Sequence, residues 1–151
     1  MHRIMAVDDS ETVLHALGKT LRRHTDWEVE LFSDACAALQ RARTCVFDAF
    51  VCDVHMPGCN GVDLLAEIRD IQPHACRILL SGTTDTDTLI RAINDAGAFR
   101  FFGKPWRDQD LIEALKLGLQ HKDRITENRI LADRARERME TWAIPPLSAQ
   151  C

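Results

Sequence analysis

Short apolar runs alternate along the chain with longer segments in which apolar residues return at helical spacing. This alternation is typical of repeated strand and helix units around a parallel sheet. Five such repeats are present, and several apolar runs are nearly continuous, as expected of strands buried on both faces. The predicted strands are 3–7, 28–32, 49–53, 77–81 and 99–103.

Helices are predicted between these strands at about 10–24, 34–44, 61–71 and 85–96. Each begins near a residue whose side chain can accept hydrogen bonds from the first free N–H groups of a helix. These capping candidates are Ser10, Ser33, Asn60 and either Thr84 or Asp85. We expect Gly97 to close the fourth helix and Pro73 to end the third.

A fifth helix begins near Arg107 and is predicted to continue to Pro145, which is too long for one helix docked on the sheet. Its first part should cover the sheet, and residues beyond about 121 should project. Along this helix, one line of residues repeats at alternating steps of four and three, as in a coiled coil. This line consists of His121, Ile125, Asn128, Ala132, Ala135, Met139 and Trp142.

The line contains no leucine and includes Asn128, so two interpretations stay open. This segment either forms a homodimer through residues 118–142 or stays in solvent, as a charged helix or a frayed tail. We therefore expect a domain over 1–121, a charged helical extension or coiled-coil linker over 122–144, and a flexible tail over 145–151.

The length of 151 residues fits one domain with an appendage. The net charge is −4, so the chain lacks the strongly basic character of proteins that bind nucleic acid directly. The first apolar stretch is too short for a signal peptide, and no segment is long enough to span a membrane, so we expect a cytoplasmic protein. The six cysteines form no CxxC pair. Reduced, packed thiols are expected, with disulfides as the lesser alternative.

Polar residues that can carry chemistry stand where the predicted strands end. They are Asp8 and Asp9 after the first strand, Asp53 on the third, Ser81 on the fourth and Lys104 after the fifth. Functional groups of an open parallel sheet gather beyond the carboxyl ends of its strands. We therefore expect these five side chains to meet in one pocket.

Three carboxylates in one pocket need a cation, because two of them 4 Å apart repel by about 4 kcal/mol at an effective dielectric constant of 20. Mg²⁺ prefers carboxylate oxygens and commonly bridges to phosphate. We expect Asp53 to be a nucleophile that attacks phosphorus, while Asp8, Asp9 and one oxygen of Asp53 hold Mg²⁺. Lys104 and the hydroxyl group of Ser81 would then bind the phosphoryl oxygens.

Four short segments, 7–10, 53–61, 80–82 and 104–105, read VDDS, DVHMPGCNG, LSG and KP. In this order and spacing they resemble the signature of bacterial two-component response-regulator receiver domains. The resemblance implies a flavodoxin-like α/β fold with a five-stranded parallel sheet of order 2-1-3-4-5 and five helices, (βα)5, the last one extended. It also implies that Asp53 accepts a phosphoryl group from a sensor histidine kinase or a phosphotransfer protein. The backbone carbonyl of His55 would complete the metal site.

The resemblance further implies a switch made of Ser81 and Phe101, which reshapes the surface of the fourth helix, fifth strand and fifth helix. That surface would control a downstream effector protein or a fused output domain. The chain is not expected to turn over an external substrate. Two alternatives stay open: a Mg²⁺-dependent aspartyl-phosphate phosphatase of the haloacid dehalogenase type, and a scaffold module of the same fold that is not phosphorylated.

Overall fold

A computed structural model of the chain describes residues 1–24, 26–82 and 86–143. One sheet contains five parallel strands in the order β2-β1-β3-β6-β7. Its strands are β1 (His2–Val7), β2 (Trp27–Phe32), β3 (Ala49–Asp53), β6 (Cys76–Ser81) and β7 (Arg100–Gly103). Because β6 and β7 are the fourth and fifth predicted strands, the expected order 2-1-3-4-5 is confirmed.

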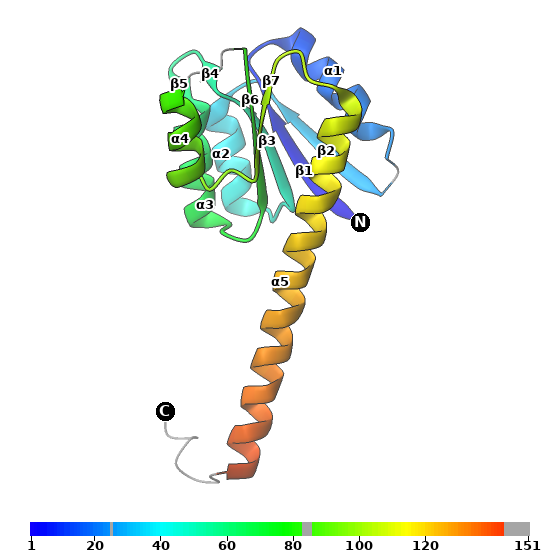
Figure 1. The fold of residues 1–151 in the computed structure, drawn as a ribbon, viewed down its shortest axis with the longest axis vertical. Helices are drawn as coiled ribbons and strands as arrows, with labels where there is room; N and C mark the ends of the chain where they lie inside the picture. Colours follow the sequence, from blue (N-terminus) through cyan, green and yellow to red (C-terminus); the bar gives the residue numbers. More distant parts are fainter. Residues whose placement is uncertain (25, 83–85, 144–151) are drawn as a thin grey trace.

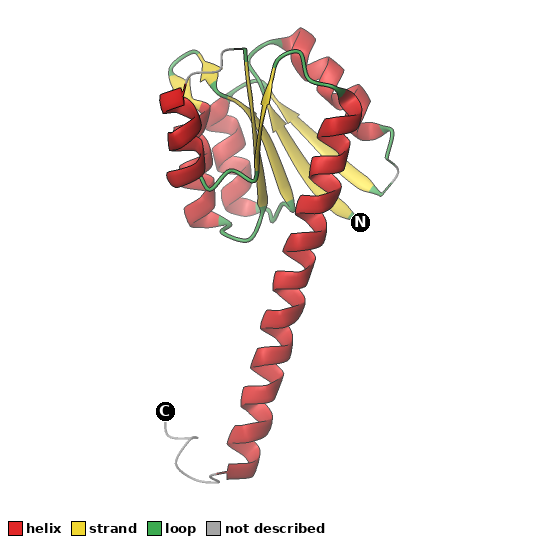
Figure 2. Ribbon diagram, in the orientation of Figure 1, coloured by secondary structure: helices red, strands yellow, loops and turns green. Residues whose placement is uncertain are grey.

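Helices cover both faces of this sheet, as Figures 1 and 2 show. The helices are α1 (Glu11–Arg22), α2 (Ala35–Thr44), α3 (Gly61–Ile71), α4 (Thr86–Asn94) and α5 (Asp108–Ala143). Helices α1 and α5 lie on one face, and α2, α3 and α4 lie on the other. The fold is thus the expected (βα)5 arrangement with an extended last helix.

The helix caps agree with the sequence in two cases and differ in one. Ser10 and Asn60 cap α1 and α3 as predicted, each accepting a backbone N–H with its side-chain oxygen. The prediction that Ser33 caps the second helix is wrong, because Asp34 accepts the N–H groups of Cys36 and Ala37 instead. A carboxylate offers two acceptor oxygens and a negative charge that the helix N-terminus favours. The candidates Thr84 and Asp85 lie outside the described residues.

A small antiparallel hairpin between β3 and α3 was not predicted. It pairs β4 (His55–Met56) with β5 (Cys59–Asn60). Its turn contains Gly58, whose φ of 71° lies in the left-handed region that glycine adopts without strain. Strands of two residues are too short to produce an alternating pattern, so the sequence carries no periodic signal for them.

The core consists of two apolar layers separated by the sheet. On β1, Met5 and Val7 pack toward α2, α3 and α4, whereas Ile4 and Ala6 pack toward α1 and α5. All four side chains are fully buried. This two-sided burial explains why the strand reads as a continuous apolar run.

Helix α5 first docks on the sheet and then extends away from the domain, as Figure 1 shows. Leu111, Ala114, Leu115 and Leu119 are buried against the layer that it shares with α1. Although α5 is long, no described helix combines the length and the apolar character needed to cross a membrane.

Three polar contacts join the domain to the part of α5 beyond residue 121. The amine of Lys122 pairs with the carboxylate of Asp48. Asp123 Oδ2 lies 3.0 Å from His2 Nε2, and Arg129 Nη1 lies 2.9 Å from His74 Nε2.

The parts expected over 1–121 and 122–144 stay a prediction, as does the homodimer through residues 118–142. The expected tail over 145–151 lies outside the described residues.

Candidate functional site

The carboxyl ends of the parallel strands hold the side chains that the sequence singled out. Asp53 is the last residue of β3 and Ser81 the last of β6, while Asp8 and Lys104 directly follow β1 and β7. A backbone hydrogen bond aligns the ends of β6 and β7, because the Lys104 N–H donates to the Ser81 carbonyl over 2.7 Å. On the neighbouring strand, Asp53 lies opposite Leu80. Strand register thus gathers residues that are far apart in sequence.

Three acidic side chains meet at this edge of the sheet. One carboxylate oxygen from each of Asp8, Asp9 and Asp53 lies within 4.8 Å of the others. Asp8 is fully buried and Asp53 is 5% exposed, whereas Asp9 faces solvent. The N–H of Ser10 donates to Asp8 Oδ1 over 2.9 Å, which orients the buried carboxylate.

Lys104 bridges the two buried carboxylates. Its Nζ lies 2.8 Å from Asp8 Oδ2 and 3.0 Å from Asp53 Oδ1. Burial alone would lower the pKa of Lys104, but the hydrogen bonds to the two carboxylates outweigh it and raise that pKa. The side chain is therefore a charged ammonium group at neutral pH.

Burial also raises the pKa of Asp53, and the charges of Asp8 and Asp9 act in the same direction. The hydrogen bond from Lys104 opposes this shift without cancelling it. One ammonium group thus faces three carboxylates, and the site keeps an excess of negative charge. An all-oxygen donor set with this charge fits Mg²⁺, which binds through few protein ligands and keeps several waters.

The other expected site residues lie around this cluster. The side chain of Ser81 is fully buried beside the pairing partner of Asp53, and His55 is exposed in β4. Phe101 is half-buried and packs against the apolar layer formed with α2, α3 and α4. It lies on β7 opposite Leu79, three positions before Lys104. Its ring therefore connects the site end of β7 to the core rather than to the acids.

Sequence reasoning missed the role of Gly61 in positioning Asp53. A Cβ atom at Gly61 would lie 1.9 Å from the backbone oxygen of Asp53. The backbone N–H of Gly61 donates to the Val54 carbonyl over 2.7 Å. The first turn of α3 therefore packs directly on the end of β3. The only signal in the sequence is a glycine immediately after the cap Asn60.

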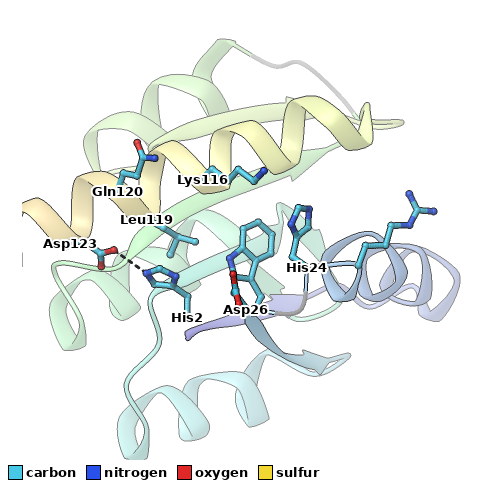
Figure 3. Close-up of a pocket in the computed structure, with 9 residues that line it drawn as sticks. His2, His24, Asp26, Lys116, Leu119, Gln120 and Asp123 are labelled. Atoms are coloured by element: carbon cyan, nitrogen blue, oxygen red, sulfur yellow. Dashed lines mark hydrogen bonds and ion pairs between the residues drawn. The ribbon is translucent and has the colours of Figure 1, made fainter.

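An open depression of about 490 Å³ lies beside the acids and is lined by Asp9 and the β4–β5 hairpin. A second depression, of about 430 Å³, lies where β1 and β2 begin, at the opposite end of the strands. Figure 3 shows its titratable side chains, among them His2, Lys116 and Asp123. Because it lies at the far end of the sheet, it adds no group to the acidic site.

Comparison with known proteins places these features in one family. The model of the response regulator receiver domain matches residues 4–116. The response regulator protein TmoT of Ectopseudomonas mendocina is 34% identical over 125 residues, which cover 83% of this chain and 56% of that protein. The chain spans 24–56% of the length of the curated relatives that it resembles.

Solved structures give the same result. The signal receiver domain of an HD domain-containing protein from Pseudomonas fluorescens is 34% identical, with a TM-score of 0.77 over 81% of this chain and 97% of that one. A response regulator protein from Burkholderia pseudomallei, solved with a phosphorylated aspartic acid and a calcium ion, is 25% identical. Its TM-score is 0.71, and the match covers 91% of this chain and 75% of that one.

Proposed function

The chain belongs to the response regulator receiver domain family, and from its site we propose that Asp53 accepts a phosphoryl group and thereby switches a protein surface. The observation that carries the proposal is the bridge made by Lys104 between the carboxylates of Asp8 and Asp53. It places an ammonium group and an excess of negative charge beside the buried carboxylate of Asp53 at the end of β3.

Asp8, Asp9, Asp53 and the backbone carbonyl of His55 would hold Mg²⁺. When bound, Mg²⁺ supplies positive charge next to the oxygens of an incoming phosphoryl group. An oxygen of Asp53 attacks phosphorus, and the bond from phosphorus to a histidine nitrogen of a sensor kinase or phosphotransfer protein breaks. The electron pair of that bond returns to the ring nitrogen, which takes up a proton from solvent, so the histidine leaves as neutral imidazole. The relative from Burkholderia pseudomallei, solved with a phosphorylated aspartic acid, supports the choice of an aspartate as acceptor.

Lys104 and Ser81 bind the oxygens of the new phosphoryl group. The Lys104 amine already contacts Asp53, so it reaches a phosphoryl oxygen on that residue by a small movement. The Ser81 hydroxyl group donates a second charge-assisted hydrogen bond. Phe101 follows into the space that Ser81 leaves, which couples the site to the packing of β7.

The surface that responds carries exposed apolar side chains. Ile90 and Ile93 on α4 are 49% and 58% exposed, and Leu117 on α5 is 50% exposed. Large exposed apolar side chains are available as contacts for a partner protein. We propose that this α4-β7-α5 surface binds a downstream effector protein or an output domain in the cytoplasm. The relatives are longer than this chain, so an output domain can belong to the same polypeptide.

The test is phosphorylation by acetyl phosphate and Mg²⁺, followed by the intact mass of the protein. We expect one added phosphoryl group on the wild type, and none on Asp53→Asn or without Mg²⁺. Asp48→Asn serves as a matched control, because Asp48 pairs with Lys122 away from the site. Lack of a Mg²⁺-dependent adduct on the wild type would favour the scaffold alternative, and turnover of p-nitrophenyl phosphate would favour the phosphatase.

A further inference from the structure

On the part of α5 that extends from the domain, basic and acidic residues occupy different positions around the helix. The line Ile125, Asn128, Ala132, Ala135 and Met139, here called the seam, repeats at steps of three and four. In a coiled coil, two positions per heptad flank such a seam and face the flanks of the partner helix. Between residues 122 and 139 the flanking positions are Lys122, Arg124, Arg129, Leu131, Arg136 and Arg138.

The flanks therefore hold five of the six basic residues of this segment and none of its acidic ones. The remaining basic residue, Arg134, lies on the outer positions. The acidic residues Asp123, Glu127, Asp133 and Glu137 lie there as well. Pairs of opposite sign within the helix, such as Arg136 with Asp133, need an acid and a base three or four positions apart. They do not by themselves require the flanks to hold only basic charges.

The structure presents this surface to solvent from residue 128 onward, whereas Lys122 and Ile125 lie against the domain. Leu131 is 57% exposed and Met139 is 68% exposed, and the flanking side chains of Arg124 and Arg138 are also exposed. Ala132 and Ala135 leave space on the seam for larger side chains of a partner. The contacts of Lys122, Asp123 and Arg129 with the domain hold the first turns of the extension in place. A helix held in this way loses less conformational entropy when it binds.

A second copy of the chain does not match these flanks. In a parallel pair, each flank contacts the other helix five positions further on, so Arg124 faces Arg129 of the second copy. In an antiparallel pair, like flanks meet and almost every contact is basic against basic. Neither arrangement provides a flank contact of opposite charge.

We propose that the extension of α5 binds an acidic amphipathic helix of a different protein chain, with glutamate or aspartate along its flanks and large apolar side chains over Ala132 and Ala135. Nucleic acid would leave the apolar seam without a partner. This interaction does not involve Asp53, so binding of a helix to the extension and phosphorylation of Asp53 are measured independently.

The test uses synthetic helical peptides of about three heptads with leucine and isoleucine on the seam. One peptide has glutamate at every flanking position, a second has the same composition with the glutamates on the outer positions, and a third has lysine on the flanks. Fluorescence anisotropy against the full chain should show at least about tenfold tighter binding of the first peptide than of the other two. This preference should weaken as the salt concentration rises.

Two matched variants locate the contact. Arg138→Glu reverses a charge on the flank and Arg134→Glu reverses one on the outer face, so both change the net charge equally. We expect Arg138→Glu to weaken binding of the first peptide by about fivefold and Arg134→Glu to leave it within about twofold. The triple variant Arg124→Glu, Arg136→Glu, Arg138→Glu should prefer the lysine peptide.

Several results would overturn the proposal. They are equal binding of the first two peptides, equal effects of the two single variants, a stable homodimer through the extension in sedimentation, or tighter binding to duplex DNA or to phosphatidylserine vesicles than to the first peptide. Circular dichroism of each variant verifies that the helix is retained.

Discussion

The side-chain amine of Lys104 lies 2.8 Å from Asp8 Oδ2, although 96 positions separate the two residues in the sequence. The contact forms because β1 and β7 end at the same edge of the sheet, with β3 and β6 between them. The amine also reaches Asp53, so one ammonium group compensates two buried carboxylates. A divalent cation that binds here therefore reduces an existing excess of negative charge.

Asp53→Asn should stabilise the protein at pH 7 without Mg²⁺. Burial raises the pKa of Asp53 in the folded protein. The stability that Asp53 contributes is therefore fully present below its pKa in the unfolded chain, and it is lost as pH rises through its pKa in the folded protein. At neutral pH the ionised wild type therefore lacks it. Mg²⁺ at about 100 times its Kd should stabilise the wild type by about 2.7 kcal/mol.

Urea unfolding with and without Mg²⁺ measures both effects. The variant should gain much less from Mg²⁺ than the wild type, because it lacks one carboxylate ligand. The exposed Asp70 provides a control, since Asp70→Asn removes one charge away from the site. Equal gains from Mg²⁺ in wild type and Asp53→Asn would contradict the assignment of Asp53 as a ligand.

Gly61→Ala should both destabilise the protein and slow its phosphorylation, whereas Gly82→Ala should do neither. A Cβ at Gly61 would lie 1.9 Å from the backbone oxygen of Asp53, and a Cβ at Gly82 meets nothing within 4 Å. Backbone must move to relieve such a contact, which costs about 1–3 kcal/mol. Thermal unfolding and the rate of acetyl phosphate labelling test the pair, and similar values for both variants would show that the contact is not rigid.

Apolar runs and strand-end residues predicted the strands, the helices and a meeting of the acids, because these are local signals that a parallel sheet brings together. The order of the strands followed only from the resemblance of the motifs to a known family. It did not distinguish Asp8 from Asp9, and the structure buries the first and exposes the second. That difference depends on the tertiary position of a single turn after β1. The choice of Asp34 over Ser33 as the cap of α2 likewise depends on where the helix starts.

Very short strands and contacts between elements were also missed. The β4–β5 hairpin has strands of two residues, which no periodicity can indicate. The approach of Gly61 to Asp53 and the contact of Lys122 with Asp48 join different elements of the fold. Spacing along the chain contains no trace of such contacts, since each residue by itself is compatible with an ordinary surface position.

Ser81→Ala should still accept a phosphoryl group but fail to transmit it. The hydroxyl group is buried at the end of β6, and its proposed hydrogen bond to the phosphoryl group is the step that moves Phe101. Amide hydrogen exchange with and without acetyl phosphate should therefore change over α4 and β7 in the wild type and not in the variant. Thr44→Ala is the control, because Thr44 is an exposed hydroxyl residue at the last position of α2, away from the acids. An exchange response in Ser81→Ala equal to that of the wild type would refute the switch role.

Asp48→Asn tests the attachment of the extension to the domain. The Asp48 carboxylate accepts a hydrogen bond from the Lys122 amine and another from the Arg3 N–H, the latter over 2.8 Å. Burial acts to raise the pKa of Asp48, but these two hydrogen bonds outweigh it and the pKa is lowered. The variant should lose about 1–2 kcal/mol of stability at pH 7, because a partly buried ammonium group is left without its partner.

The pH dependence of this loss distinguishes an ionic contact from simple packing. Because the folded pKa of Asp48 is lowered, its stabilising effect is present above the unfolded value of about 3.9 and disappears as pH falls through the folded pKa. The difference in unfolding free energy between wild type and Asp48→Asn should therefore be constant from pH 7 to about 5 and shrink below about 4. Lys122→Met should show the same decline with pH. A difference that persists unchanged at acid pH would mean that Asp48 stabilises the protein by packing, and that the extension is not held to the domain by charge.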